Sequence, residues 1–207
     1  MGFGKKEVSI KAPAFMTAEY RIEGTAPLVV NKFSHKAFEQ MKAKQEAGKQ
    51  KVSKAKEGKD FHECFMQARH LSEEGWDGVP AATFRKAIIT ACKLVGFPMT
   101  KAKLGIFVES DGIDATEGTP LCKIIGEAPE HVEHHVRLET GVADIRARPM
   151  WRKWAFNLRV KFDSDMFTTE DITALLMRAG MQCGVCEGRP SSDSGGMDWG
   201  TFRLIQD

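Results

Sequence analysis

A run of cationic side chains without a single acidic one lies between residues 145 and 162. Arginine and lysine bind phosphate oxygens, and such contacts supply most of a protein's sequence-independent affinity for nucleic acid. A tryptophan within the run could stack on a base. The alternative is a charged strand face that only keeps a sheet in solution. The absence of acids favours a nucleic-acid-binding surface made by Arg146, Arg148, Trp151, Arg152, Lys153, Asn157, Arg159 and Lys161.

A second basic segment, residues 42–59, carries seven lysines but only one large apolar residue, Val52. A segment with so little to bury is expected to be a flexible loop. It either serves only to keep the protein soluble or closes over a bound strand. In the second case its phosphate contacts would come from lysines such as Lys49, Lys51, Lys54 and Lys56.

A glycine-rich loop, residues 184–200, provides a third candidate site. Glycine allows the backbone to approach a ligand closely, and Arg189, the only cation of the loop, is a natural phosphate contact. The loop matches neither a Walker motif nor a dinucleotide-binding fingerprint. Its acids, Glu187, Asp193 and Asp198, weaken the interpretation as a phosphate cradle, and a long turn without a ligand is the alternative.

Cys183 and Cys186 have the spacing of half a zinc site or of a redox pair. A structural zinc ion needs about four ligands, and the sequence contains no second pair of this spacing. Cys122 with a histidine from positions 131, 134 or 135 would be needed to complete a site. A redox pair would begin a helix, whereas this pair follows one. We therefore expect neither a metal nor another cofactor.

The element expected to present the basic run is a strand over residues 153–162. Its apolar side chains point to one side, and Lys153, Asn157, Arg159 and Lys161 point to the other. Helical periodicity predicts helices over residues 81–95 and 169–179. Pro80 suits the start of the first helix, Thr168 and Asp171 resemble a capping box for the second, and a glycine follows each.

The remaining pattern predicts strands near residues 18–22, 104–108 and 201–205, a helix over 34–41 and a short helix from Phe61. The order is β-α-β, an insertion with a projecting hairpin over residues 112–150, then β-α-β. This order predicts an α+β fold with a ferredoxin-like or RNA-recognition-like split βαβ core. Both helices would cover one face of an antiparallel sheet and leave the other open. We expect one domain over residues 1–207.

Composition limits the function classes. The chain has 30 Lys and Arg against 28 Asp and Glu, so net charge does not by itself indicate nucleic-acid binding. No apolar stretch approaches the roughly 20 residues of a membrane span, and the N-terminus lacks a signal-peptide pattern. The cysteines are odd in number, and two of them lie on apolar helix faces. This usage indicates a reducing, cytoplasmic environment.

Several features together resemble the RAMP superfamily, the ferredoxin-like backbone and processing subunits of CRISPR systems, and related phage-encoded proteins. They are the order of elements, the apolar run at residues 24–30, the helix opening at Val79-Pro80-Ala81, and the glycine-rich loop with Arg189-Pro190 before Gly200-Thr201-Phe202. The resemblance implies sequence-independent binding of single-stranded RNA or DNA and side-by-side assembly along the strand. For a phage protein, the compartment would be the bacterial cytoplasm.

The resemblance also supplies a rival function. Processing endonucleases of this family place a general-base histidine shortly after the first strand, and His35 lies in that region. His35 would cleave RNA without a metal, with Lys32 or Lys36 stabilising the developing charge. A surface histidine at a helix start is the simpler interpretation. The sequence therefore predicts non-catalytic binding, with an endoribonuclease and a phage protein-binding or structural module as alternatives.

Overall fold

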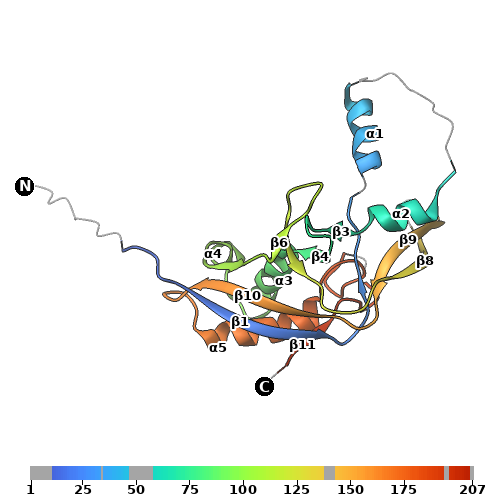
Figure 1. Cartoon of the computed structure of the whole chain (residues 1–207). Coiled ribbons are helices and arrows are strands. Elements are labelled where there is room, and N and C mark those ends of the chain that lie inside the picture. Colours follow the sequence, from blue (N-terminus) through green and yellow to red (C-terminus); the bar gives the residue numbers. More distant parts are fainter. Residues whose placement is uncertain (1–10, 34, 47–57, 138–142, 194–195, 206–207) are drawn as a thin grey trace, which may run out of the picture.

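The main sheet of the computed structural model contains β1 (Phe15–Gly24), β5 (Ile106–Val108), β10 (Ala155–Asp163) and β11 (Phe202–Leu204) (Figure 1). The structure describes residues 11–33, 35–46, 58–137, 143–193 and 196–205. The strand order is β11-β1-β10-β5, and all neighbours in it are antiparallel. The protein is an α+β structure with antiparallel sheets.

Two amphipathic helices pack against one face of this sheet. They are α3 (Ala81–Leu94), which follows Pro80, and α5 (Thr169–Arg178). The predicted capping box is confirmed, because the Thr168 hydroxyl accepts from the Asp171 backbone N–H at 3.2 Å while the Asp171 carboxylate accepts from the Thr168 N–H at 2.9 Å. A π-helical turn, η1 (Ala179–Cys183), continues from α5 toward the glycine-rich loop.

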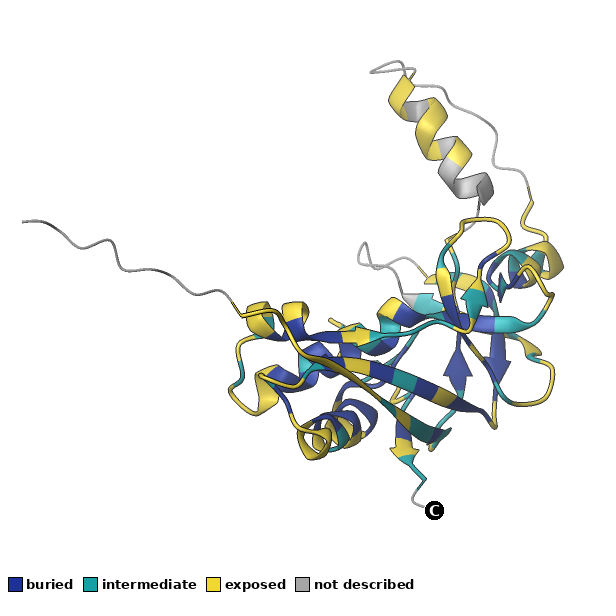
Figure 2. Ribbon diagram, turned by 60° about the vertical axis from the view of Figure 1, so that its left-hand side comes forward, coloured by how far each residue is buried: buried dark blue, intermediate teal, exposed yellow. Residues whose placement is uncertain are grey.

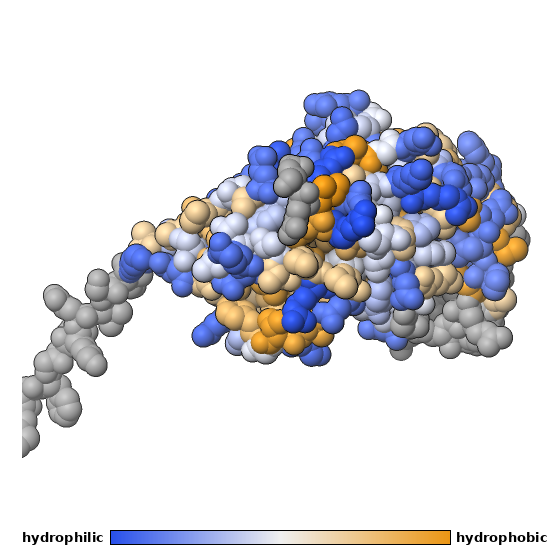
Figure 3. All heavy atoms as spheres, turned by 90° about the horizontal axis from the view of Figure 1, so that it is seen from below, coloured by the Kyte–Doolittle hydropathy of each residue, from blue (hydrophilic) through white to orange (hydrophobic). Residues whose placement is uncertain are grey.

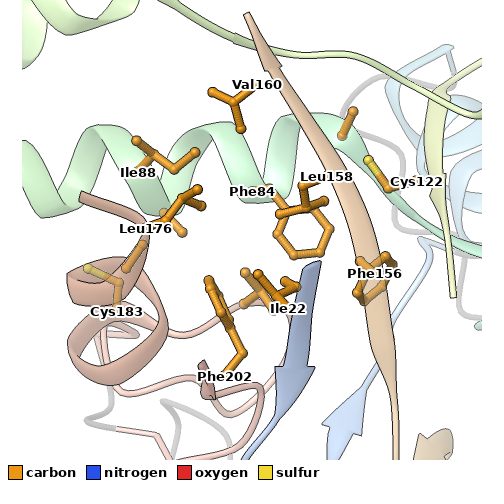
Figure 4. Close-up of a cluster of buried hydrophobic side chains, with 14 of the residues drawn as sticks. Ile22, Phe84, Ile88, Cys122, Phe156, Leu158, Val160, Leu176, Cys183 and Phe202 are labelled. Atoms are coloured by element: carbon orange, nitrogen blue, oxygen red, sulfur yellow. The ribbon is translucent and has the colours of Figure 1, made fainter. Parts of the chain in front are cut away.

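The core lies between these helices and the sheet (Figure 4). The inward side chains of β10, including Phe156 and Leu158, are fully buried, as the alternation of the strand predicts. Phe84 of α3 meets Phe156 edge to face, with 4.8 Å between ring centroids. Burial of each such side chain contributes about 1.5–3 kcal/mol, which fixes the strand with its polar side chains pointing away from the helices.

The predicted insertion over residues 112–150 is not one hairpin. β6 (Gly112–Ile113) and β7 (Pro120–Lys123) join β4 (Asp77–Pro80) and β3 (His70–Leu71) in a small sheet. β8 (Glu130–Arg137) pairs with β9 (Ala143–Trp151), which also pairs with β2 (Leu28–Val29). The insertion therefore contributes to two sheets.

The helices α1 (His35–Glu46) and α2 (Phe61–Gln67) precede the small sheet, and α1 projects from the rest of the chain (Figure 1). α1 continues to Glu46, so the first residues of the predicted loop 42–59 are helical, contrary to expectation. No helix in the described residues is long and apolar enough to cross a membrane.

One predicted strand begins too early. Residues Met99–Gly105 form the helix α4, and β5 starts only at Ile106. Leu104 is 73% exposed, so the apolar pattern around it reflects a surface side chain rather than a buried strand. Seen from below, the molecular surface carries small hydrophobic patches separated by hydrophilic side chains (Figure 3). Scattered apolar side chains of this kind are usual on protein surfaces.

Candidate nucleic-acid interface

The face of the main sheet opposite α3 and α5 is uncovered in the described residues, and buried positions alternate with more exposed ones along β10 from Phe156 onward (Figure 2). Asn157 and Lys161 of β10 are exposed on this open face, and Arg159 between them is partly exposed. Thr17 lies opposite Lys161, and Glu19 lies opposite Arg159. The outward direction predicted for the polar side chains of β10 is therefore confirmed.

Carboxylates hold two arginines of the open face, Arg159 and Arg203, so this face is less basic than the predicted run of cations indicates. Arg159 lies 3.3 Å from a carboxylate oxygen of Glu109 and 3.3 Å from one of Asp111. Arg203 of β11 pairs with Glu23 of β1. Arg21 donates to the Asn157 side-chain oxygen at 2.7 Å. The acidic partners lie outside residues 145–162, which is why that run alone did not reveal them.

Lys161 and Arg21 are the cations of this face that make no ion pair with a described residue, and Arg21 is held by the Asn157 side chain. The Nζ atom of Lys161 lies 5.2 Å from the centroid of the Phe15 ring. Phe15 and Phe107 are 39% and 37% exposed and meet edge to face, with 5.8 Å between ring centroids. The Arg85 guanidinium lies 4.7 Å from the centroid of Phe107. The open face thus carries an exposed aromatic pair beside Lys161, and Arg85 of α3 reaches Phe107 at the β5 edge of the sheet, where it donates to the Ile106 carbonyl oxygen.

Sequence reasoning missed Phe15 and Phe107. Phe15 occupies an outward position of β1, two residues before Thr17, and Phe107 lies opposite Lys161 in the register of β5 and β10. The alternating pattern of the first strand, extended back to residue 15, could have indicated Phe15. The position of Phe107 on the open face could not be predicted, because the start of β5 was placed two residues too early.

The other predicted cations lie away from this face, because residues 145–162 form two strands in different sheets. Arg148 of β9 binds Glu187 at 2.8 Å, and Arg146 lies 3.7 Å from the same carboxylate. Arg152 binds Glu130 at 2.9 Å, and Lys153 is exposed in the turn between β9 and β10. The basic run is therefore not one continuous phosphate-binding strip.

The prediction that Trp151 stacks on a base is wrong. Its side chain belongs to the core and is only 3% exposed. The residue lies opposite Leu28 in the pairing of β9 with β2. An indole ring in this position could meet a base only after the surrounding core had opened.

The glycine-rich loop packs closely on its own backbone. A Cβ atom on Gly200 would lie 1.9 Å from the carbonyl oxygen of Val185. Arg189 donates to the carbonyl oxygen of Cys186 at 3.0 Å, and Glu187 receives Arg148. Close packing of the backbone therefore explains why position 200 is a glycine, without any ligand. Arg189 lines a surface groove on the helix side of the molecule.

The cysteine pair comes after α5, as expected, with Cys183 as the last residue of η1 and Cys186 in the loop beyond it. Cys183 is buried in the core, and burial raises the pKa of the Cys186 thiol to about 12, so neither thiol has the character of a reactive thiolate. Among the described residues, no three histidine, cysteine or acidic side chains are grouped so that they could hold a metal ion.

His35 is the first residue of α1, but its side chain lies outside the described part of the structure, and so do Lys49, Lys51, Lys54 and Lys56. Lys32 cannot assist His35 in the proposed way. Its Nζ atom is committed to the buried carboxylate of Asp114, at 2.7 and 2.8 Å from the two oxygens. The Lys32 side chain is 9% exposed, so the charge-stabilising role predicted for Lys32 is wrong, whereas the side chain of the alternative, Lys36, lies outside the described residues.

Comparison with known proteins adds no identification. The chain matches no protein-family model, and a comparison with curated protein sequences finds no significant match.

Proposed function

We propose that this protein binds single-stranded nucleic acid without sequence preference and without catalysis, on the open face of the main sheet. The observation that carries the proposal is the exposed pair of Phe15 and Phe107 beside Lys161. Every base has a flat π-face, so stacking on aromatic rings tolerates any sequence. A duplex hides these faces, so the platform favours single strands.

The charge pattern determines how strongly phosphates contribute. Lys161 is the unpaired lysine on this face, whereas Arg159 and Arg203 are held by carboxylates. Each phosphate contact on a single strand contributes a slope of about 0.7 to the dependence of log affinity on log salt. We therefore expect a shallow salt dependence and a binding energy dominated by stacking.

The topology supports a ferredoxin-like core as part of the proposal. The chain runs β1-α3-β5 and later β10-α5-β11, and the strand order β11-β1-β10-β5 is the interleaved order of two split βαβ units. A ferredoxin-like core is also what the resemblance to the RAMP superfamily implies. Assembly along a strand belongs to the same proposal, and titration with oligonucleotides of increasing length tests it through the stoichiometry.

Removing the Phe15 ring tests the platform. We expect Phe15→Ala to weaken binding of a single-stranded oligonucleotide roughly 5- to 150-fold, because stacking contributes about 1–3 kcal/mol per base. Fluorescence anisotropy with single- and double-stranded RNA and DNA at several salt concentrations measures this. Phe15 is exposed, so circular dichroism should show an unchanged fold. Unchanged affinity in the folded variant would exclude the platform.

The role of Lys161 is tested against a matched control. Lys161→Gln and Arg203→Gln remove the same charge from the same face, but Arg203 is paired with Glu23. We expect only Lys161→Gln to lower the salt slope by about 0.7. Equal effects of the two changes would mean that the face acts only through net charge.

Two outcomes would favour the alternative functions. If no oligonucleotide binds the wild-type protein, the protein-binding alternative is favoured. If the wild-type protein cleaves RNA in EDTA and His35→Ala does not, the endoribonuclease is favoured.

A further inference from the structure

A groove of about 580 Å³ lies on the helix side of the molecule, away from the open face of the main sheet. It is lined by α3, by the glycine-rich loop, by the two residues that follow β2, and by single residues of β3, β4 and β9. Lys86 comes from α3, Arg189 and Glu187 from the loop, Arg146 from β9 and His70 from β3. Its volume falls in the range of about 300–1,000 Å³ that is usual for small-ligand sites.

Cations in the groove can receive an anion. Lys86 is exposed and has no ion pair with a described residue. Arg189 uses one guanidinium nitrogen on the Cys186 carbonyl and makes no ion pair within the described chain. Arg146 is only loosely held, at 3.7 Å from Glu187 and 3.9 Å from Asp144. A phosphate group is the anion that such a mixture of lysine and arginine binds well.

His70 adds a hydrogen-bond acceptor. Its Nδ1 atom lies 3.0 Å from the Asp114 carboxylate, which is completely buried. The same carboxylate accepts from Lys32 and from the backbone N–H groups of Thr116 and Glu117, at 2.9 and 3.0 Å. A carboxylate with this set of donors is ionised, so Nδ1 of His70 carries the proton and Nε2 has the lone pair.

The Nε2 atom of His70 is accessible to solvent, since the buried side-chain nitrogen or oxygen that lacks a partner among the described residues is Nδ1 of His134. The His70 side chain is 9% exposed and lines the groove, and its Nε2 atom has no hydrogen-bond partner among the described residues. Burial lowers the pKa of His70, against the opposing effect of Asp114, so the ring favours its neutral form. An accessible acceptor in a groove that Lys86, Arg146 and Arg189 line together with the carboxylates of Glu187 and Asp193 suits a ligand with both a phosphate and hydroxyl donors.

We propose that the groove binds a phosphorylated sugar, with the phosphate against Lys86 and Arg189 and a sugar hydroxyl donating to Nε2 of His70. The carboxylate of Glu187 and the hydroxyl groups of Thr83, Thr90 and Ser191 supply partners for further sugar hydroxyls. No aromatic ring except that of His70 lines the groove in the described chain, so the site recognises the sugar phosphate rather than a base. The unit comes from a free sugar phosphate or from the backbone of RNA.

Isothermal titration calorimetry with ribose 5-phosphate, inorganic phosphate and free ribose tests the site. We expect ribose 5-phosphate to bind more tightly than either half. His70→Asn keeps a donor near the Nδ1 position but has no acceptor at Nε2. It should weaken ribose 5-phosphate roughly threefold to tenfold, the effect of one hydrogen bond, and leave phosphate binding unchanged. Lys86→Gln should weaken both ligands, whereas Lys93→Gln on the same helix, outside the groove lining, should weaken neither.

Matched RNA and DNA oligonucleotides separate the two sources. If the unit is part of RNA, His70→Asn lowers affinity for RNA but not for DNA; if it is free, only ribose 5-phosphate responds. Unchanged binding of both ribose 5-phosphate and RNA in His70→Asn overturns the inference, and so does an unchanged response in Lys86→Gln. Lys161→Gln changes oligonucleotide binding on the sheet face but not ribose 5-phosphate binding, so this inference and the proposed function can fail separately.

Discussion

Replacing Asp114 with alanine is expected to lower the free energy of unfolding by about 3–5 kcal/mol, because it leaves the charge of Lys32 buried without a partner. Asp114 is completely buried and Lys32 is 9% exposed, so water can solvate neither charge well. The carboxylate also joins Lys32, which follows β2, to His70 of β3 and to the turn at Thr116. Urea unfolding followed by circular dichroism measures the loss.

A double variant separates the charge effect from simple loss of contacts. Lys32→Met alone should also be strongly destabilising, because it removes the main counter-ion of Asp114. The double variant Asp114→Asn with Lys32→Met removes both charges, and we expect it to lose less stability than the losses of the single variants Asp114→Asn and Lys32→Met added together. Strictly additive losses would show that the two side chains do not form a coupled ion pair.

The same cluster predicts a pH dependence. Burial would raise the pKa of Asp114, but hydrogen bonds from Lys32, Thr116 and Glu117 outweigh it and hold the pKa well below the usual 3.8. The unfolded chain therefore binds a proton first as the pH falls below that value, and the stabilising contribution is lost as the pH approaches the folded pKa. The pKa of His70 is lowered from 6.5, so its contribution to stability also falls as the pH drops below that value. Urea unfolding at decreasing pH should show a loss of stability below pH 6.5 from His70 and a further loss below pH 3.8 from Asp114. The variant Asp114→Asn should lack the loss below pH 3.8.

Gly200→Ala is expected to lower the free energy of unfolding by about 2–5 kcal/mol. Placing a residue with a Cβ in the left-handed backbone conformation costs about 1–2 kcal/mol, and the overlap of that Cβ with a neighbouring atom costs about 1–3 kcal/mol. Gly200 has φ of 68°, and an added Cβ would lie 1.9 Å from the Val185 carbonyl oxygen. That oxygen belongs to the backbone, so no flexible side chain can move aside. Gly200 also donates to Pro27 and accepts from Val185, which ties the glycine-rich loop to the start of β2.

Gly75→Ala is the matched control for this prediction. Gly75 has φ of 85°, but an added Cβ would meet nothing within 4 Å. It should therefore cost only the backbone part, about 1–2 kcal/mol. Thermal and urea unfolding of both variants give the difference, which measures the contact with Val185. Equal losses would show that the loop relaxes around position 200 without cost.

Much of the fold could be predicted because its signals are local. The alternation along β10, the helical stripe of α3 and the Thr168 and Asp171 capping box each depend on residues a few positions apart. The helix α4 was missed because an apolar residue at position 104 that faces solvent resembles one that begins a strand. Local patterns do not say which side of a short segment a neighbouring element will cover.

The sequence by itself therefore determined the helices α3 and α5, the long strands β1 and β10, and the outward direction of Asn157, Arg159 and Lys161. Only the tertiary structure decided which of those charges are paired. Arg159 pairs with Glu109, and Arg148 pairs with Glu187. Lys32 pairs with Asp114, which lies 82 positions further along the chain. Coulomb attraction depends on distance in space rather than along the chain, so folding converts a basic run into paired side chains and leaves Lys161 beside two exposed rings.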